Sequence, residues 1–221
     1  MPKNFINIHT HQKNQNSCGN FALFNAFDKE TDVPCSYGIH PWYVEKASSE
    51  QFLRLEKLIQ QENCYAVGEC GLDKLTQTAW DLQLTTFERQ IELSEKYQKP
   101  LLIHCVKAVQ EIVVLKRKHQ PQQPWIFHGF RKTNTVQQLL ENGFFISIGT
   151  AILTDEKLQT SIVDIPLEKL FLETDDKAIS IRAVYEKVAE LRQLSITELA
   201  SQLVENFNTV FTTYSSNQSN D

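Results

Sequence analysis

Leu101-Leu102-Ile103-His104 is a short apolar run that ends in a histidine. Comparable runs recur along the chain, and many of them also end in a polar or ionisable residue. Runs of this length are typical of buried strands, so we predict a strand at each. The eight predicted strands are Phe5–His9, Phe21–Ala26, Cys35–His40, Cys64–Glu69, Leu101–His104, Trp125–His128, Phe144–Ile148 and Leu170–Glu173.

Segments with apolar residues at helical spacing lie between several of these strands. In Ala79–Tyr97, for example, Trp80, Leu84, Phe87 and Ile91 recur every three or four positions. Alternating strands and helices predict an α/β fold with a parallel sheet, and eight strands predict a (β/α)₈ barrel of the TIM type. The segment between the second and third strands is too short for a helix, so we expect a compact, slightly trimmed barrel. Further helices are predicted at Ser49–Gln61, Val106–His119, Thr133–Asn142, Ala183–Leu194 and Ile196–Phe211.

Composition is that of an ordinary globular protein. The 221 residues are 41% hydrophobic and carry a formal net charge of −5, which argues against a generally basic surface for nucleic acid. We predict one domain over residues 1–214 and a polar tail over residues 215–221. The five cysteines are an odd number without a Cys-x-x-Cys pair, which disfavours a disulfide framework. With no apolar run long enough to span a bilayer and no signal peptide, we expect a soluble, cytoplasmic protein that does not associate with membranes.

Ionisable residues gather at the predicted strand ends. His9 and His11 close the first strand, and residues two apart on a strand face the same side. Each residue alone is compatible with a hydrogen-bonded core histidine or, for Asp175, a helix cap. The whole set favours metal ions, because imidazole and carboxylate groups suit Zn²⁺, Mn²⁺, Fe²⁺ or Co²⁺. The set is His9, His11, Glu69, His104, His128 and Asp175.

Several motifs occur in the order seen in TatD-family hydrolases, which are metal-dependent deoxyribonucleases with an amidohydrolase-like barrel. The resemblance extends from His9 to Phe211 and rests on the combination of motifs. These are Ile8–His11, Gly38–Trp42, Gly68–Asp73, Ile103–Ala108, His128–Arg131, Leu172–Asp175 and Asn206–Phe211.

The resemblance implies a catalytic centre with two divalent ions, such as Zn²⁺, Mn²⁺ or Mg²⁺. It assigns His9, His11, Glu69 and Asp175 to one ion. Glu69, His104 and His128 would bind the second, so that Glu69 bridges the two. Catalysis would rest on Asp175, which orients or deprotonates the attacking water, and on Glu69. The expected activity is phosphodiester hydrolysis, with DNA degraded from an end and no obligate protein partner.

The chain departs from the family pattern at one position that would support a ligand and in loops that shape the substrate groove. The acidic residue that family members often carry two positions before the first histidine is Asn7 here. Val106-Lys107-Ala108 replaces Arg-Glu-Ala, and no proline follows Asp175 closely. A small phosphodiester or an amide therefore stays open as the substrate, and a barrel that binds without catalysis is a further alternative.

Cationic and aromatic side chains follow the predicted strand ends. We expect His40, Lys107 and Arg131 to bind substrate phosphate, although ordinary salt bridges at the barrel rim would explain the same residues. Trp42 and Tyr43 would stack on a base or pack under a loop. Cys70 and Cys105 follow metal-ligand candidates by one residue and are predicted to be packing residues (strand alternation turns them away).

Overall fold

The computed structural model describes residues 5–13 and 20–211, which fall into two compact units. Unit 1 contains the described residues up to Phe24 and those from His128 onward, and unit 2 is Asn25–Phe127. The predicted tail at residues 215–221 and Cys18 lie outside the described residues. The prediction of one domain over residues 1–214 is not tested by this division and stays a prediction.

All eight predicted strands are present, and they are ordered as they follow one another in the chain. The recorded pairings β1–β2, β3–β4, β4–β5, β5–β6 and β7–β8 are all parallel. The α/β class is therefore confirmed. The strands are β1 Ile6–Thr10, β2 Phe21–Phe27, β3 Cys35–Tyr37, β4 Cys64–Asp73, β5 Leu101–Val106, β6 Trp125–Phe127, β7 Phe145–Ile148 and β8 Leu170–Leu172.

The helices also follow the predicted order, with differences at their ends. Residues 28–34 hold no helix, as expected from their length. A short helix, α5, was not predicted, and neither was the 3₁₀ helix η1 at Pro41–Lys46. The α-helices are α1 Ser49–Ile59, α2 Trp80–Tyr97, α3 Val109–His119, α4 Val136–Glu141, α5 Glu156–Ser161, α6 Ile181–Arg192 and α7 Ile196–Phe211. No described helix combines the length and apolar character needed to span a bilayer.

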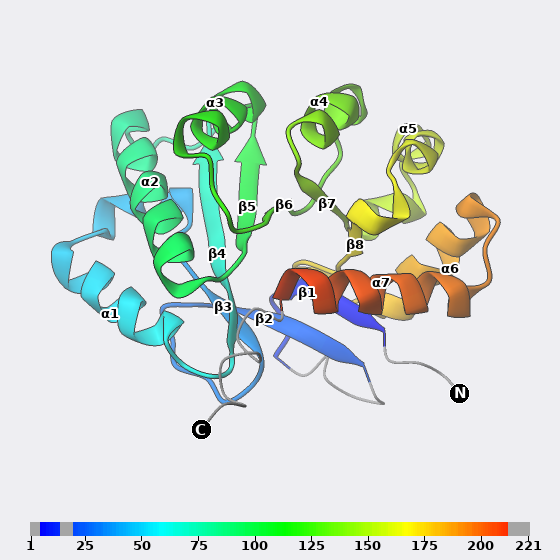
Figure 1. Cartoon of the computed structure of the whole chain (residues 1–221), viewed down its shortest axis with the longest axis horizontal. Coiled ribbons are helices and arrows are strands. Elements are labelled where there is room, and N and C mark those ends of the chain that lie inside the picture. The colour runs from blue at the N-terminus through cyan, green and yellow to red at the C-terminus, as the bar shows by residue number, and fades with distance from the viewer. Residues whose placement is uncertain (1–4, 14–19, 212–221) are drawn as a thin grey trace. The chain divides into compact units, whose positions relative to one another are not determined.

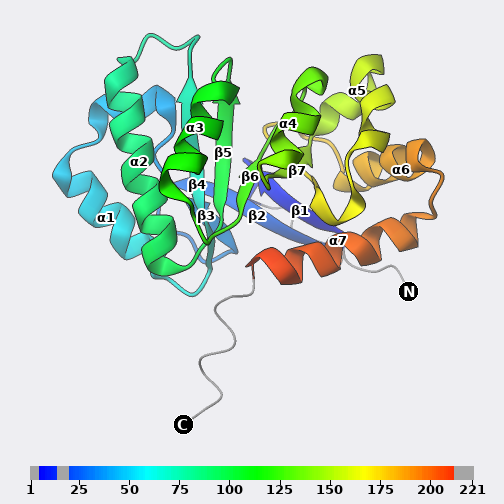
Figure 2. The same ribbon diagram turned by 45° about the horizontal axis from the view of Figure 1, so that its top comes forward.

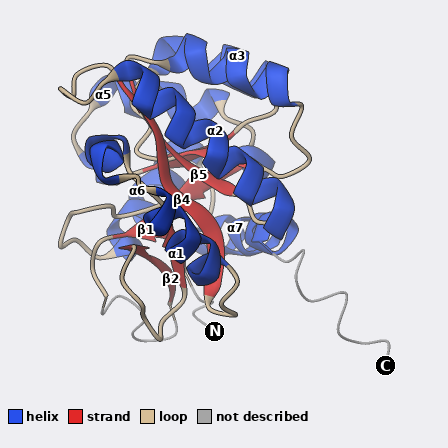
Figure 3. Cartoon of the chain, turned by 90° about the vertical axis from the view of Figure 1, so that its left-hand side faces the viewer, coloured by secondary structure: helices blue, strands red, loops and turns tan. Residues whose placement is uncertain are grey.

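In unit 2, α2 packs along the long strand β4 (Figures 1 and 3). Phe87 of α2 is fully buried, and its ring lies edge-on to Trp125 of β6 with the centroids 5.7 Å apart. Gln90, on the same helix, accepts a hydrogen bond from Ile39 N (2.7 Å) and donates one to Ile39 O (3.0 Å). The helix thereby fixes the backbone that leads from β3 to His40.

In unit 1, α6 and α7 pack against each other, and α7 also packs against the strand β1 (Figure 2). The hydroxyl of Tyr185 on α6 accepts a hydrogen bond from Ile6 N and donates one to Ile6 O, both at 3.0 Å. On α7, the side-chain amide of Asn206 donates to Leu167 O and Leu170 O at the start of β8. Two helices from the C-terminal part of the chain therefore hold the strands β1 and β8 that carry His9 and lead to Asp175.

Candidate metal centre

Two imidazoles and one carboxylate meet at the carboxyl end of β1 in unit 1. His9 is fully buried on β1, and His11 follows the strand and is partly exposed. Their Nε2 atoms lie 3.5 Å and 3.3 Å from the same oxygen, Oδ1 of Asp175. One ligand atom from each residue lies within 4.8 Å of the other two, a spacing that would let one ion contact all three.

The backbone fixes Asp175 beside β1. Its N–H donates to His9 O at 3.1 Å, and its carbonyl accepts from His11 N at 3.0 Å. Its φ of 54° lies in the left-handed region, which is uncommon for a non-glycine residue and is often found at functional sites. Burial raises the pKa of the Asp175 carboxyl, but hydrogen bonds from His11 and His9 outweigh it and hold that pKa well below its ordinary value.

His128 lies beside this cluster and is oriented by a buried carboxylate. Its ring centroid is 4.4 Å from that of His9, and its Nδ1 lies 3.3 Å from Oε1 of Glu173. The same oxygen accepts from Gly129 N at 2.6 Å, and the other accepts from the Ser147 hydroxyl. Glu173 therefore fixes which nitrogen of His128 can turn toward an ion. The sequence predicts Glu173 only as the end of a strand, and its place in the Leu172–Asp175 motif is the signal that could have pointed to this role.

In unit 2, a second cluster is built around Glu69 on β4. Oε1 of Glu69 lies 2.8 Å from Nδ1 of His104 on β5, and Oε2 accepts a hydrogen bond from the Asn25 side-chain amide at 2.9 Å. Glu69 is 4% exposed, and a buried carboxylate of this kind requires partners or an ion. Asn25, at the end of β2, was not predicted, because an asparagine at a strand end carries no distinctive sequence signal.

His40 lies within this cluster, at 3.2 Å from its Nε2 to Oε1 of Glu69. Its Nδ1 accepts a hydrogen bond from Trp42 N at 3.1 Å. A neutral imidazole that accepts at Nδ1 carries its proton on Nε2, so His40 acts toward Glu69 as a donor and not as a metal ligand in this tautomer. The ring is buried, which places it deeper than the rim position expected for a phosphate contact.

Asp73, at the end of β4, holds the other side of His104. Its Oδ2 lies 3.4 Å from Nε2 of His104 and accepts a hydrogen bond from the indole N–H of Trp42 at 2.7 Å. Its Oδ1 accepts from Leu75 N and caps the turn that follows. Burial raises the pKa of Asp73, but these hydrogen bonds, chiefly the one from Trp42, leave it lower than its ordinary value. Asp73 remains a carboxylate that can orient His104.

The donor set of the two clusters fits divalent metal ions such as Zn²⁺ or Mn²⁺, because it combines imidazole nitrogens with carboxylate oxygens. Cys70 does not add a thiolate to this set of metal ligands. That side chain is fully buried with its Sγ 3.7 Å from Leu102 O, and burial raises the pKa of its thiol far above the ordinary value. Its position agrees with the predicted packing role.

Asn7 occupies the position where the family often carries an acid. Its side-chain amide donates to Thr174 Oγ1 at 2.9 Å, and its Oδ1 accepts from Thr174 N at 3.1 Å. The residue therefore anchors the segment that precedes Asp175. Although Asn7 departs from the family pattern, its side chain still supports Asp175 through Thr174.

The remaining predicted substrate contacts lie on the exposed surface. A cleft of about 230 Å³ in unit 1 is bordered by Arg131, Asp175 and Lys177. The Arg131 side chain is 65% exposed, with its guanidinium 3.5 Å from Asp155. In unit 2, Lys107 is exposed just after β5 and has a φ of 53°. Arg131 thus borders the same cleft as Asp175, a proposed metal ligand. The role of His40, Lys107 and Arg131 in binding substrate stays a prediction.

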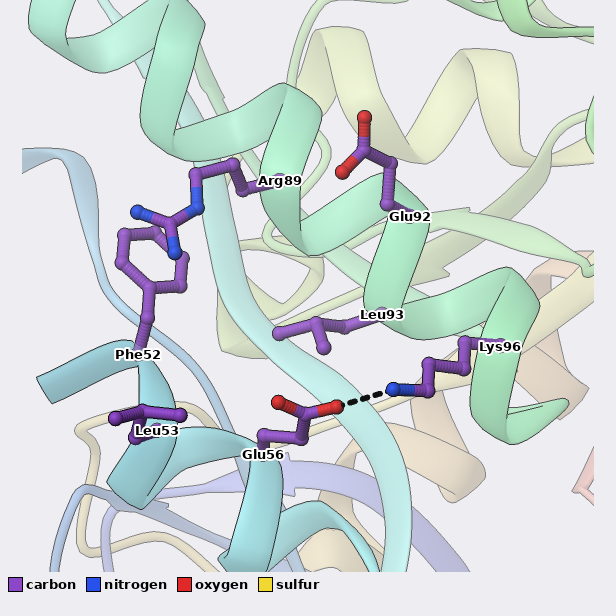
Figure 4. Close-up of a pocket in the computed structure, with 7 residues that line it drawn as sticks. All are labelled: Phe52, Leu53, Glu56, Arg89, Glu92, Leu93 and Lys96. Carbon is purple, nitrogen blue, oxygen red and sulfur yellow. Dashed lines mark hydrogen bonds and ion pairs between the residues drawn. The ribbon is translucent and has the colours of Figure 1, made fainter. Parts of the chain in front are cut away.

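A second pocket, of about 220 Å³, lies between α1 and α2 of unit 2 (Figure 4). The Arg89 guanidinium stacks over the Phe52 ring at 3.5 Å from its centroid, and Lys96 forms an ion pair with Glu56. The pocket is lined by none of the predicted ligands, so we assign it no role in the chemistry.

Imidazoles and carboxylates at the carboxyl ends of parallel strands are the arrangement of a metal-dependent hydrolase. The family model described as "TatD related DNase" matches residues 3–212. The chain belongs to this TatD-related family, which confirms the predicted family.

Curated relatives carry names that agree with this class. The chain is 28% identical to an "Uncharacterized metal-dependent hydrolase" of Haemophilus influenzae, over 62% of this chain and 56% of that protein. A Buchnera aphidicola protein of the same description is 29% identical, over 88% of this chain and 80% of its own length. A "3'-5' ssDNA/RNA exonuclease TatD" of Pantoea sp. is 32% identical, over 62% of this chain and 55% of that protein. The chain thus spans little more than half of the Haemophilus and Pantoea proteins. These names support the predicted metal-dependent nuclease class.

The fold is shared with a solved structure from the same family. The Escherichia coli TatD homologue YJJV superposes with a TM-score of 0.83 at 21% identity, covering 94% of this chain and 98% of that one. A likeness at this level shows the fold, and it confirms the predicted TIM-type barrel.

Proposed function

We propose that this chain hydrolyses phosphodiester bonds of DNA from one end, using two divalent ions. The observation that carries the proposal is the cluster of His9, His11 and Asp175, whose ligand atoms lie within 4.8 Å of one another at the end of β1. The names of the relatives, which include a single-strand DNA and RNA exonuclease, support the substrate class.

The proposed ligand assignment is the one that the family resemblance implies. His9, His11, Glu69 and Asp175 hold one ion, and Glu69, His104 and His128 hold the other. Divalent ions at these ligands would supply a water of lowered pKa and a positive charge for the leaving oxygen.

The chain's own groups position the reactants and move the proton. Asp175 orients the attacking water or takes its proton, because its carboxylate lies beside the two imidazoles, His9 and His11, that would hold the ion. His40 donates from Nε2 to Glu69 and keeps that carboxylate in place. Arg131 and Lys107 bind the phosphates that flank the scissile bond.

A small phosphodiester or an amide is the second candidate substrate. The observation that favours it is the short connection from Asp175 to the start of α6 at Ile181, which leaves few residues to wall a long groove. Metal-bound water attacks many such bonds, so the ligands do not discriminate between the candidates.

The test uses metal-stripped protein, end-labelled single-stranded DNA, and Mg²⁺, Mn²⁺ or Zn²⁺ added back in turn. We expect metal-dependent shortening of the DNA from one end. Asp175→Asn should lower turnover by about 10²–10⁴-fold, the range for loss of a general base. Its matched control is Asp176→Asn, which changes the exposed neighbouring carboxylate that pairs with Lys177. Equal activity of the Asp175 and Asp176 variants would reject the role of Asp175.

A panel of small phosphodiesters and amides tests the second candidate in the same preparations. If the small substrates are hydrolysed and DNA is left intact, a small phosphodiester or an amide becomes the substrate. The proposed metal centre is kept. No hydrolysis of any substrate, despite stoichiometric metal binding, would reject the proposed function.

A further inference from the structure

Trp42 is a large apolar side chain that is 54% exposed beside the Glu69 cluster. It lies in η1, whose neighbouring residues Pro41 and Val44 are buried and anchor the segment. Pro41 O also accepts a hydrogen bond from the Thr78 hydroxyl at 2.8 Å. Packing under a loop, the alternative that the sequence left open, does not agree with this exposure.

The edge of the indole ring is fixed while one part of the ring stays open to solvent. The indole N–H donates to Oδ2 of Asp73, which is 3% exposed. The ring lies edge-on to His40 and His104, with centroids 4.8 Å and 6.1 Å away. These contacts limit rotation of the side chain, so that it presents a preformed aromatic surface next to two imidazoles of the cluster.

The surroundings add a second ring and positive charge. Tyr43 is 45% exposed, and Lys46 Nζ lies 5.9 Å from its ring centroid. An exposed ring whose edge is fixed, with a second exposed ring and a lysine in the same short helix, suits a flat aromatic group that is attached to a phosphate backbone. Base stacking on such rings, next to basic side chains, is how proteins hold unpaired nucleic acid.

From this geometry, we propose that Trp42 is the stacking platform that holds an unpaired base of the substrate next to the Glu69 cluster. The inference rests on the proposed function and deepens it by naming a residue that would hold the substrate. In a duplex both faces of a base are already covered by its neighbours in the stack. An unpaired base can place one face on the indole.

The test measures binding separately from hydrolysis. The probe is a short oligothymidylate with phosphorothioate linkages, which resist cleavage, added to the full chain loaded with Mn²⁺. A strand with the same linkages but abasic sugars is the control probe, and a blunt duplex is the competitor. Tryptophan fluorescence reports contact with the base, and fluorescence anisotropy of a labelled strand gives Kd.

Two substitutions separate stacking from the hydrogen bond to Asp73. Trp42→Leu removes the ring and the N–H, whereas Trp42→Phe keeps a ring without the N–H. We expect Trp42→Leu to raise Kd for the oligothymidylate about tenfold, the effect of losing one base–aromatic stack. Trp42→Phe should raise it by no more than about threefold, since a smaller ring still stacks. Trp80→Leu, the same change at the start of α2, is the matched control and should leave Kd unchanged.

The outcomes distinguish this inference from the proposed function. Fluorescence quenching by the oligothymidylate but not by the abasic strand, together with the tenfold loss in Trp42→Leu, supports the platform even if no substrate is hydrolysed. Three results would overturn it: equal quenching by the abasic strand, equal losses in the Leu and Phe variants, or equal affinity for the duplex. Each of these would leave a metal-dependent hydrolysis of DNA standing.

Discussion

Nδ1 of His128 and Oε1 of Glu173 lie 3.3 Å apart, and Glu173 is completely buried. His104 has the corresponding relationship with Asp73, but through Nε2, at 3.4 Å. A carboxylate that holds one imidazole nitrogen leaves the opposite nitrogen to coordinate an ion. We therefore expect His128 to coordinate through Nε2 and His104 through Nδ1.

This relationship predicts a metal-binding defect in Glu173→Gln. The variant keeps the size of the side chain but turns an amide toward Gly129 N–H, His128 or Ser147, where the carboxylate only accepts. Loss of such a partner typically weakens metal affinity about 10–100-fold. Titration calorimetry with Zn²⁺ would measure it, with Glu168→Gln as the exposed control. Unchanged affinity in a folded Glu173→Gln protein would show that Glu173 does not orient His128.

Asn7→Asp should be tolerated, whereas Asn7→Leu should not. An aspartate at this position still accepts from Thr174 N, and the Thr174 hydroxyl can donate to it in place of Thr10 Oγ1, its acceptor in the native chain. Leucine leaves the buried Thr174 N–H without that acceptor, which costs about 1–3 kcal/mol in the free energy of unfolding. Urea denaturation would compare the two variants. The idea fails if Asn7→Leu is as stable as the native chain.

Gly71→Ala should prevent correct folding of unit 2. Gly71 has a φ of 141°, and a Cβ there would lie 2.1 Å from His104 O on the neighbouring strand. Gly143 provides a matched control, because its φ is 71° but no atom lies within 4 Å of a Cβ. We expect Gly143→Ala to lower the free energy of unfolding by about 1 kcal/mol and Gly71→Ala to give little folded protein. Circular dichroism would show the difference, and two equally stable variants would contradict the close approach of β4 and β5.

Arg131→Ala should weaken DNA binding more than it slows hydrolysis of a small diester. The guanidinium borders the cleft beside Asp175. It can form charge-assisted hydrogen bonds to a phosphate that flanks the scissile bond in DNA, and a small diester has no such flanking phosphate. We expect Kd for DNA to rise about tenfold, as for loss of one charged hydrogen bond. Arg182→Ala, which breaks a comparable surface ion pair with Glu186, is the control. Equal losses on DNA and the small diester would argue against a phosphate contact.

The strands could be predicted from the sequence because burial on both faces leaves continuous apolar runs. Helix ends were less accurate. The predicted helix at Val106–His119 begins only at Val109, since Val106 still pairs with Asp73 in the sheet. The helix α5 was missed because it is six residues long and buries only Leu158. Its one local signal is Asp155, whose carboxylate caps the first turn.

The ligand candidates could be predicted because each of them ends or follows an apolar run. The groups that orient them could not, because their role depends on partners distant in the chain. Glu173 and His128 are 45 positions apart, and Asn25 and Glu69 are 44 apart. The tautomer of His40 could not be predicted for a different reason: Trp42, whose N–H sets it, is a near neighbour, but the turn that brings this N–H to Nδ1 is seen only in the structure.

The hydrogen bonds between Asp175 and the backbone of β1 have a consequence for protein synthesis. His9 and His11 are synthesised and leave the ribosome well before Asp175 is added. A nascent chain that has not reached Asp175 lacks the third side chain of this cluster and the hydrogen bonds to His9 and His11 that hold it. Under the proposed function, a growing polypeptide would lack nuclease activity until Asp175 has been added to the chain and is held beside β1.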